Sequence, residues 1–409
     1  MNLRMPTSIG YVSPFNLTKQ SRFAVTKSFI KTACVSLVLS AACFFSTVAP
    51  AQAATANITP FLSTPLFVGA QLSQPLIAGL PPGNAVTDGA ALLRYSLPID
   101  NEEIRKVQGD LEGLSEWLRS KRWGSMKRDL KKVGRSLERK RDAILASVPE
   151  ARQARAGEIL DSLTADLEPI RAAVEAEDKE GVWVERKRML DQVSELEELM
   201  VQGYPFEVPE EYSNLPQLKG RATVKFTTTK GDVTVVADGY SAPVTAGNFV
   251  DLVNKKFYDD MPFIRAEDFY VLQTGDPEGP EEGYIDPKTN EYRAIPMEIL
   301  VKGDDEPIYG YTLEEIGQYM DEPILPFNSY GSLALARPSD DNNGGSSQFF
   351  FFLFEAELTP AGRNMLDGRY AVFGYTIDGK ETLRTLSQED KIISARVIDG
   401  AENLVMPRA

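Results

Sequence analysis

The chain has no histidine, and both of its cysteines, Cys34 and Cys43, lie within the first 53 residues. These absences exclude Ser-His and Cys-His nucleophile pairs, zinc sites with the usual ligands, and haem or iron–sulfur ligation in the rest of the chain. Carboxylate, guanidinium, ammonium, hydroxyl, amide and aromatic groups are what is left for chemistry. We therefore expect no metal site and no cofactor, and a function that depends on hydrogen bonds, charge and apolar pockets.

Four consecutive phenylalanines, Phe349 to Phe352, follow the polar stretch NNGGSS. Successive side chains of a strand point to opposite faces, so this run predicts a strand with apolar surroundings on both sides. The glycines and serines before it supply a loop that can approach a ligand's backbone closely. A doubly buried core strand with no ligand role would explain the same run.

Three separated stretches give a more specific signal when they are taken together: MPFIRAEDFYVLQTGD (261–276), GSLALARPSDDNNGGSSQFFFFL (331–353) and NMLDGRYAVFGY (364–375). In order and spacing they resemble the core motifs of the cyclophilin prolyl isomerases, and the resemblance covers about residues 221–409. It implies a cyclophilin-like closed antiparallel β-barrel capped by helices, and a peptidyl-prolyl cis-trans isomerase activity that uses no cofactor.

The resemblance places Arg265 on the family's catalytic arginine. The substrate-binding residues that it implies are Tyr270, Val271, Gln273, Ala336, Asn343, Gln348, Phe350, Met365, Leu366 and Tyr370. Four of these depart from the family's pattern, because Tyr270 and Val271 replace Phe and Met, Met365 replaces Trp, and Tyr370 replaces His. Two hypotheses follow: an isomerase, or a chaperone or scaffold that binds proline-containing loops and turns over little.

These residue types suit rotation about the bond that precedes proline. Amide resonance gives that rotation a barrier of about 18–20 kcal/mol, so catalysis needs tighter binding of the twisted amide than of either planar form. An apolar pocket can hold the pyrrolidine ring while Arg265 donates hydrogen bonds toward the prolyl nitrogen and carbonyl. Structural roles stay open: Arg265 as a surface ion-pair residue, Gln273 as a strand-capping amide and Phe350 as plain core.

The first 53 residues differ from the remainder of the chain. They hold five basic residues and no acid, followed by an apolar run from Ala33 to Ala49 and by small residues at the cleavage spacing. This pattern predicts an export signal that is cut near Ala53, with a retained membrane anchor as the alternative. The mature chain would then be exported across a membrane, to the periplasm or, as the family resemblance given below implies, to the thylakoid lumen.

Four further regions follow the predicted signal. Residues 54–99 are rich in Pro and Gly and predict an extended segment with one short helical candidate at 89–95. Residues 100–203 have apolar residues three and four apart, which predicts a bundle of about four helices. Prolines at short intervals predict a linker at residues 204–220. In residues 221–409 apolar residues alternate with polar ones, which predicts a hairpin at 222–237 and strands at 269–272, 332–336, 348–354, 370–375 and 392–398. Helices are predicted after Pro243 and at 380–386. The predicted chain is multidomain, an all-α bundle followed by a β-barrel.

Charge is unevenly distributed along the chain. The formal net charge is −15, which argues against a general nucleic-acid-binding function. Residues 276–322 hold 14 acids and three bases, whereas residues 119–141 hold 11 bases and two acids. Both stretches could be solvated faces, or the basic helices could contact the acidic loop within the chain and gate the groove. A lipid-headgroup contact of the basic stretch is a third alternative.

A helical bundle before a cyclophilin-like barrel, in an exported chain, resembles the multidomain cyclophilins of the cyanobacterial and chloroplast thylakoid lumen. Members of that family are implicated in the assembly and maintenance of photosystem II. The resemblance therefore implies partners among proline-containing protein loops, photosystem II subunits included.

Overall fold

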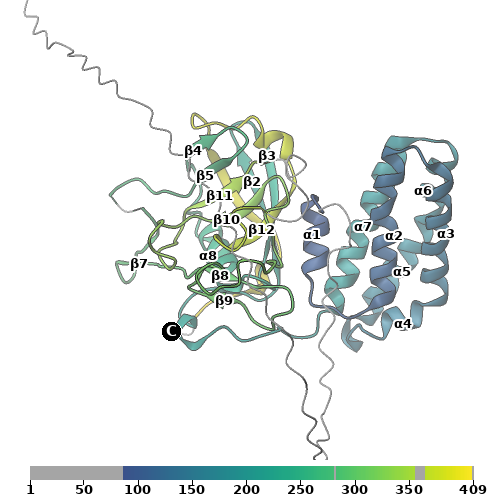
Figure 1. Cartoon of the computed structure of the whole chain (residues 1–409), viewed down its shortest axis with the longest axis horizontal. Coiled ribbons are helices and arrows are strands. Elements are labelled where there is room, and N and C mark those ends of the chain that lie inside the picture. Colours follow the sequence, from purple (N-terminus) through teal and green to yellow (C-terminus); the bar gives the residue numbers. More distant parts are fainter. Residues whose placement is uncertain (1–85, 281, 355–363, 408–409) are drawn as a thin grey trace, which may run out of the picture. The chain divides into compact units, whose positions relative to one another are not determined.

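The computed structural model describes residues 86–280, 282–354 and 364–407 (Figure 1). The predicted signal (1–53) and most of the predicted extended segment (54–99) lie outside these residues. Within them, no helix combines the length and the apolar character that crossing a bilayer requires.

The N-terminal part of the described chain is helical. Its helices are α1 (Gly89–Ser96), α2 (Glu102–Arg119), α3 (Trp123–Arg139), α4 (Arg141–Leu145), α5 (Gln153–Ala165), α6 (Leu167–Glu175) and α7 (Lys179–Met200), with a 3-10 turn at Glu150–Arg152. Helix α2 packs against α3 and α7, and α6 packs against α3 and α7. The apolar residues three and four apart form one buried core between these helices, as their spacing predicts.

Asn101 fixes the start of the bundle. Its side-chain oxygen accepts a hydrogen bond from the Ile104 backbone N–H (3.0 Å), which caps α2, and its amide donates to the carbonyl of Ala143 (3.1 Å) and to Ser147 Oγ (2.8 Å). The same side chain therefore begins one helix and holds α4 and the residue Ser147 that follows it.

The basic stretch 119–141 is partly neutralised inside the bundle. In the described part of the chain its ion pairs join acids of the bundle itself, among them Lys127–Glu175 (2.6 Å), Lys132–Asp110 (3.5 Å), Lys140–Glu103 (3.4 Å) and Arg141–Asp161 (2.8 Å). Most of these residues are exposed, so each pair contributes little to stability.

The C-terminal part is a curled antiparallel sheet. Its strands are β2 (Arg221–Thr228), β3 (Gly231–Asp238), β4 (Phe263–Glu267), β5 (Val271–Thr274), β10 (Ser332–Leu335), β11 (Phe349–Phe352), β12 (Val372–Asp378) and β13 (Ile392–Asp399), in the order β13-β2-β3-β12-β10-β11-β5-β4. The two edges meet through a bridge between Pro262 and Lys391 and a hydrogen bond from Ile392 N–H to the Met261 carbonyl (2.8 Å). The predicted barrel is thus completed by a short contact and not by a continuous ladder.

Short elements complete this part of the chain. Helices α8 (Pro243–Asn254) and α9 (Lys380–Leu383) pack on the sheet, and the two-residue strands pair as β1 (Gln217–Leu218) with β14 (Leu404–Val405), β6 (Ile285–Asp286) with β7 (Glu291–Tyr292), and β8 (Glu298–Ile299) with β9 (Ile308–Tyr309). Because β1 pairs with β14, the C-terminal end of the predicted linker 204–220 is hydrogen-bonded to residues 404–405.

The strand predicted at 269–272 is wrong at its start. Residues 268–270 form the turn of a hairpin between β4 and β5, and Phe269 has a backbone φ of +60°. The apolar letters FYVL favoured a strand, but the backbone reverses there, so only Val271 and Leu272 are paired.

The four phenylalanines separate two apolar clusters, as their alternation predicts. Phe349 and Phe351 lie in the barrel interior with Phe226 and Phe249. Phe350 and Phe352 face the opposite way, into a cluster that also contains Leu92 and Leu93 of helix α1. The outer face of the sheet is therefore covered in part by a helix that precedes the bundle in sequence.

A buried guanidinium fastens α1 to the sheet. Arg221 of β2 donates hydrogen bonds to the Leu93 carbonyl, to Ser96 Oγ (3.1 Å) and to Asp238 Oδ2 (3.2 Å), and its other terminal nitrogen reaches Glu198 Oε1 (2.9 Å). Arg221 is 8% exposed and Asp238 is fully buried. Removing either charge would leave its partner desolvated and unpaired, which is the costly case for a buried pair.

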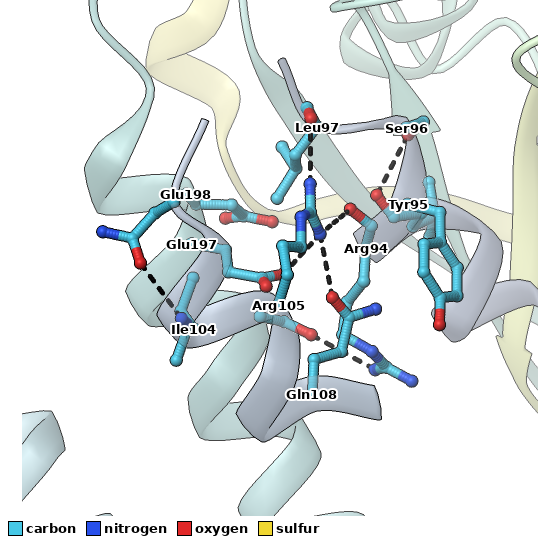
Figure 2. A network of polar contacts seen from close by, with 12 residues as sticks. Arg94, Tyr95, Ser96, Leu97, Ile104, Arg105, Gln108, Glu197 and Glu198 are labelled. Atoms are coloured by element: carbon cyan, nitrogen blue, oxygen red, sulfur yellow. Dashed lines mark hydrogen bonds and ion pairs between the residues drawn. The ribbon is translucent and has the colours of Figure 1, made fainter. Parts of the chain in front are cut away.

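A second arginine lies at the end of α1 (Figure 2). Arg105 of α2 donates to the carbonyls of Arg94 (2.8 Å) and Leu97 (3.0 Å) where α1 ends, and to Glu197 Oε2 of α7 (3.2 Å). Glu197 is fully buried. Burial raises the pKa of Glu197 to about 7 although Arg105 opposes the shift, and burial also lowers the pKa of Arg105.

This raised pKa predicts that the bundle loses stability as the pH rises. Between the ordinary pKa of a glutamate and about 7, native Glu197 holds a proton that the unfolded chain releases, so the free energy of unfolding falls across this window by up to about 3 kcal/mol. Urea unfolding followed by the fluorescence of Trp117, Trp123 and Trp183 at pH 5 and pH 8 measures this fall.

Substitution of Glu197 by Gln should reduce the difference between the two pH values without abolishing it, because the pKa of buried Glu298 is also raised to about 7. The matched control is Glu168→Gln, at an exposed position of α6, which should leave the difference as it is. A Glu197→Gln chain with an unchanged pH dependence would contradict the assignment.

Candidate functional site

One row of residues crosses the outer face of the sheet. Arg265 of β4 lies opposite Gln273 of β5, Gln273 lies opposite Phe350 of β11, and Phe350 lies opposite Ala334 of β10. Directly opposed residues share a face, and neighbouring strands are about 4.8 Å apart, so Arg265 and Phe350 are about 10 Å apart at the backbone. The register therefore brings a guanidinium, an amide and an aromatic ring together on one surface.

Arg265 is held by an acid on its own strand. Its Nε donates to Glu267 Oε1 (2.6 Å), because residues two apart in a strand point to the same face. The guanidinium also lies 5.8 Å from the centre of the Tyr270 ring. The hydrogen bond that Arg265 donates to Glu267 raises the pKa of Arg265, while the two terminal nitrogens carry the remaining four N–H donors.

Two glutamine amides are oriented by each other. Gln273 Nε2 donates to Gln348 Oε1 (2.7 Å), and Gln348 Nε2 donates to Asp276 Oδ1 (3.1 Å) and to the Glu282 carbonyl (2.9 Å). Because the amide N–H groups of Gln348 donate to Asp276 and Glu282, its amide oxygen is the atom that faces Gln273. Ala336 N–H donates to the Gln348 carbonyl (2.9 Å) and places this residue against β10.

An apolar cluster of largely buried side chains adjoins the glutamines. Phe350 is 5% exposed and Val271 is 4% exposed, and Leu366 and Tyr370 pack against the same cluster. The Tyr370 ring meets Phe350 edge to face at 5.5 Å between centroids, and the Phe327 ring lies parallel to Phe350 at 6.1 Å. Such a rigid aromatic surface is suited to a small flat apolar group.

The other expected binding residues lie more openly. Met365 is 86% exposed and Tyr270 is 38% exposed. Asn343 is exposed too, and the contacts that the structure gives it are with Asp341 Oδ1, which accepts from its N–H (2.8 Å), and with Gly310 next to its amide. The structure thus groups Arg265, Gln273, Ala336, Gln348, Phe350, Val271, Leu366 and Tyr370, with Tyr270 at the edge of this group.

Three neighbours of these residues were not predicted from the sequence. Glu267 pairs with Arg265, Phe327 stacks on Phe350, and the Arg337 guanidinium lies 5.3 Å from the centre of the Tyr370 ring. Glu267 lies two residues after Arg265 in the motif stretch 261–276, but no strand was predicted over these residues, so the sequence did not indicate that the two side chains share a face. Phe327 is distant in sequence and carries no signal either.

One acid of the stretch 276–322 is not solvated. Glu298 is 1% exposed and accepts hydrogen bonds from the backbone N–H groups of Val244 (3.1 Å) and Thr245 (2.9 Å) at the start of α8. Burial raises the pKa of Glu298 to about 7 against these bonds. A small hollow between Glu298, Ser241 and Tyr370 lies beside the apolar pocket, so part of the acidic stretch forms the support of the site.

The chemistry of this site is that of binding and charge. Among residues 86–280, 282–354 and 364–407, no group of three or more His, Cys, Asp or Glu side chains is placed to hold a metal ion. The arrangement offers a cation with further N–H donors, two fixed amides and an apolar cluster on one face. These features can bind an extended peptide and stabilise a polar, twisted amide within it.

Comparison with protein-family models gives two matches that coincide with the two parts of the fold. Residues 88–201 match the PsbQ-like domain of peptidyl-prolyl cis-trans isomerases of the CYP38-like type, and residues 223–401 match the cyclophilin-type peptidyl-prolyl cis-trans isomerase domain. The helical bundle followed by a curled antiparallel sheet thus corresponds to a helical domain joined to a cyclophilin domain.

Three relatives extend over both parts. A thylakoid lumen peptidyl-prolyl cis-trans isomerase of Synechocystis is 59% identical over 82% of this chain and 88% of its own length. The chloroplastic isomerases CYP38 and CYP37 of Arabidopsis thaliana are 42% and 30% identical, over 85% and 78% of this chain and 85% and 71% of their own lengths. The chain belongs to the cyclophilin-type peptidyl-prolyl cis-trans isomerases.

We expect Glu267 to align the Arg265 guanidinium. In Glu267→Ala the long side chain is free to rotate, so kcat/KM for a proline peptide should fall about 3-fold to 10-fold, mainly through kcat. Glu267→Gln keeps a hydrogen-bond acceptor and should lose less. A peptide isomerisation assay measures both.

The matched control is Glu381→Ala, which breaks an exposed ion pair with Arg384 on α9. It should leave kcat/KM unchanged. If Glu267→Ala were as fast as the unaltered chain or faster, the pair would restrain Arg265 and not align it.

Proposed function

We propose that this chain isomerises prolyl bonds in exported proteins of the thylakoid lumen and thereby serves as a folding factor, with Arg265 as its electrostatic catalyst. The row Arg265–Gln273–Phe350 is the observation that carries the proposal. The strand register supports the proposal, because the cation lies on the same face as an apolar cluster against which a pyrrolidine ring can pack.

The proposed mechanism is electrostatic. The proline ring is held against Phe350, Val271 and Leu366, and the oriented Gln273 amide binds the peptide backbone beside it. The terminal nitrogens of Arg265 donate to the prolyl nitrogen and carbonyl as the amide twists and loses its resonance. No bond is broken, so the protein has only to favour the twisted form.

The site of action is proposed from two observations. The first relatives are named as thylakoid lumen and chloroplastic proteins, which supports an exported, lumenal location. The N-terminal 53 residues have the pattern of an export signal, and we propose that it is cut near Ala53. We further propose that photosystem II subunits are among the clients, which the match of residues 88–201 to a PsbQ-like domain supports.

A second candidate function is a scaffold that binds proline-containing loops with little turnover. The observation that favours it is the position of Tyr370, whose ring lies against Phe350 and beneath the Arg337 guanidinium. A phenol there is bulkier than an imidazole and narrows the apolar pocket. Tight binding of a proline peptide without catalysis would identify this function.

Substitution of Arg265 by Ala separates the two functions. If the chain is an isomerase, kcat/KM should fall about 100-fold or more, because the donor to the twisted amide is lost while the pocket is kept. Peptide affinity should change much less. A coupled proline-peptide assay gives kcat/KM, and a fluorescence polarisation titration gives the dissociation constant of the peptide.

The control is Arg384→Ala at another exposed ion-paired arginine, which should behave like the unaltered chain. An Arg265→Ala chain with an unchanged rate would remove Arg265 from the mechanism. An unaltered chain that binds the peptide but does not isomerise it would establish the scaffold instead.

A contact between the basic helices and the acidic stretch 276–322 stays a prediction, and we propose it as the means by which the bundle gates the groove. If opposite charges hold these parts together, the radius of gyration from small-angle scattering should grow as salt rises from about 0.05 M to 0.5 M, because the screening length falls to about 4 Å. Unchanged dimensions would contradict this contact.

A further inference from the structure

Phe269 has a backbone conformation that its side chain disfavours. It is the third residue of the turn in which Tyr270 N–H donates to the Glu267 carbonyl (3.0 Å), and its φ is +60°. A positive φ at this turn position favours glycine or asparagine, because an L side chain crowds the backbone there. A phenylalanine is therefore a costly choice for this turn.

The other non-glycine residues with a positive φ show what such positions usually accept. Among the described residues they are Lys121, Glu177, Lys256, Asp260 and Asn290, all of them polar. Phe269 differs from this set in being apolar and bulky. Neither the turn geometry nor a preference for polar residues in turns explains it.

The core does not explain Phe269 either. Its side chain is 72% exposed, more than that of any other aromatic residue in the described part of the chain. An exposed ring in a strained conformation contributes little to folding, and such residues are found where a function requires them.

The position of Phe269 indicates what the function is. Its neighbour Tyr270 packs on Phe352 (6.1 Å between ring centroids) and lies 5.8 Å from the Arg265 guanidinium, and Val271 is in the apolar pocket. A peptide chain advances about 3.3 Å per residue in an extended form. A ring at the tip of this hairpin is thus within about two residues of a proline held by the pocket.

We propose that Phe269 is a specificity-determining residue, whose ring packs against an apolar side chain of the client within about two positions of the bound proline. This inference rests on the proposed function, since it extends the same site. The occupant is a polypeptide and not an anionic bilayer, because Glu267 and Asp268 adjoin the ring and would be repelled by lipid phosphates.

Three variants separate the ring from the strain. Phe269→Gly removes both, so affinity for an apolar client peptide should fall about 3-fold to 10-fold while the Tm of the chain rises by about 1–3 °C. Phe269→Ala removes the ring and keeps the strain, so affinity should fall equally without a rise in Tm. Phe269→Leu should retain most of the affinity.

The probes are two labelled hexapeptides with one central proline, flanked by Leu in one and by Ser in the other. Fluorescence polarisation with the full chain gives the dissociation constants, and the isomerisation assay gives kcat/KM for the same pair. We expect the Leu peptide to bind more tightly than the Ser peptide to the unaltered chain, and this preference to vanish in Phe269→Gly and Phe269→Ala.

The matched control is Lys256→Gly, which relieves a positive φ of +59° after α8. It should raise the Tm without changing either dissociation constant. Phe269→Gly that keeps the preference for Leu, or that lowers the Tm, would overturn the proposal. Loss of binding to vesicles of anionic lipid in Phe269→Ala, with peptide binding intact, would overturn it in favour of a membrane contact.

Failure of the proposed function gives a different result. An unaltered chain that neither binds nor isomerises either peptide would refute the isomerase site itself. An unaltered chain that binds both peptides equally and isomerises them would leave the isomerase in place and refute the role of Phe269.

Discussion

The hydrogen-bond register of β4, β5 and β11 is the constraint on which the site depends. A shift of one residue in either pairing would turn Arg265, Gln273 or Phe350 to the opposite face. The interior aromatic residues prevent this shift, because Phe349 and Phe351 are already packed against Phe226 and Phe249. The inner core therefore fixes which side chains the outer face presents.

Buried charge fixes the other major contact of the described chain. Arg221 ties helix α1 to Asp238 and Glu198, and Arg105 ties the end of α1 to Glu197. Apart from the partly exposed Glu198, these groups have lost most of their hydration, so each depends on the partner that the fold provides. Leu92 and Leu93 of the same helix extend the apolar cluster that contains Phe350. The helix that these arginines hold is thus part of the wall behind the site.

Local patterns predicted much of this molecule. Apolar residues three and four apart predicted the helices of the bundle, alternation predicted the β2–β3 hairpin, and Pro243 marked the start of α8. The errors occur where local and tertiary preferences differ. The letters of Phe269 and Tyr270 favour a strand although the chain turns there, and Glu298 belongs to an acidic stretch although it is buried against α8. The local sequence around these residues does not indicate the turn at Phe269 or the burial of Glu298.

The sequence by itself determined the available chemistry, since a chain without histidine and with two N-terminal cysteines is left with arginine, amides and aromatic rings. It also determined the order of the three motifs and the two-sided burial of the phenylalanine run. Only the tertiary structure decided that Gln348 orients Gln273, that Phe327 stacks on Phe350, and that the Arg337 guanidinium lies over the Tyr370 ring. The reason is physical: residue types are a local property, whereas hydrogen-bond direction and burial depend on strands that are adjacent in space and distant along the chain.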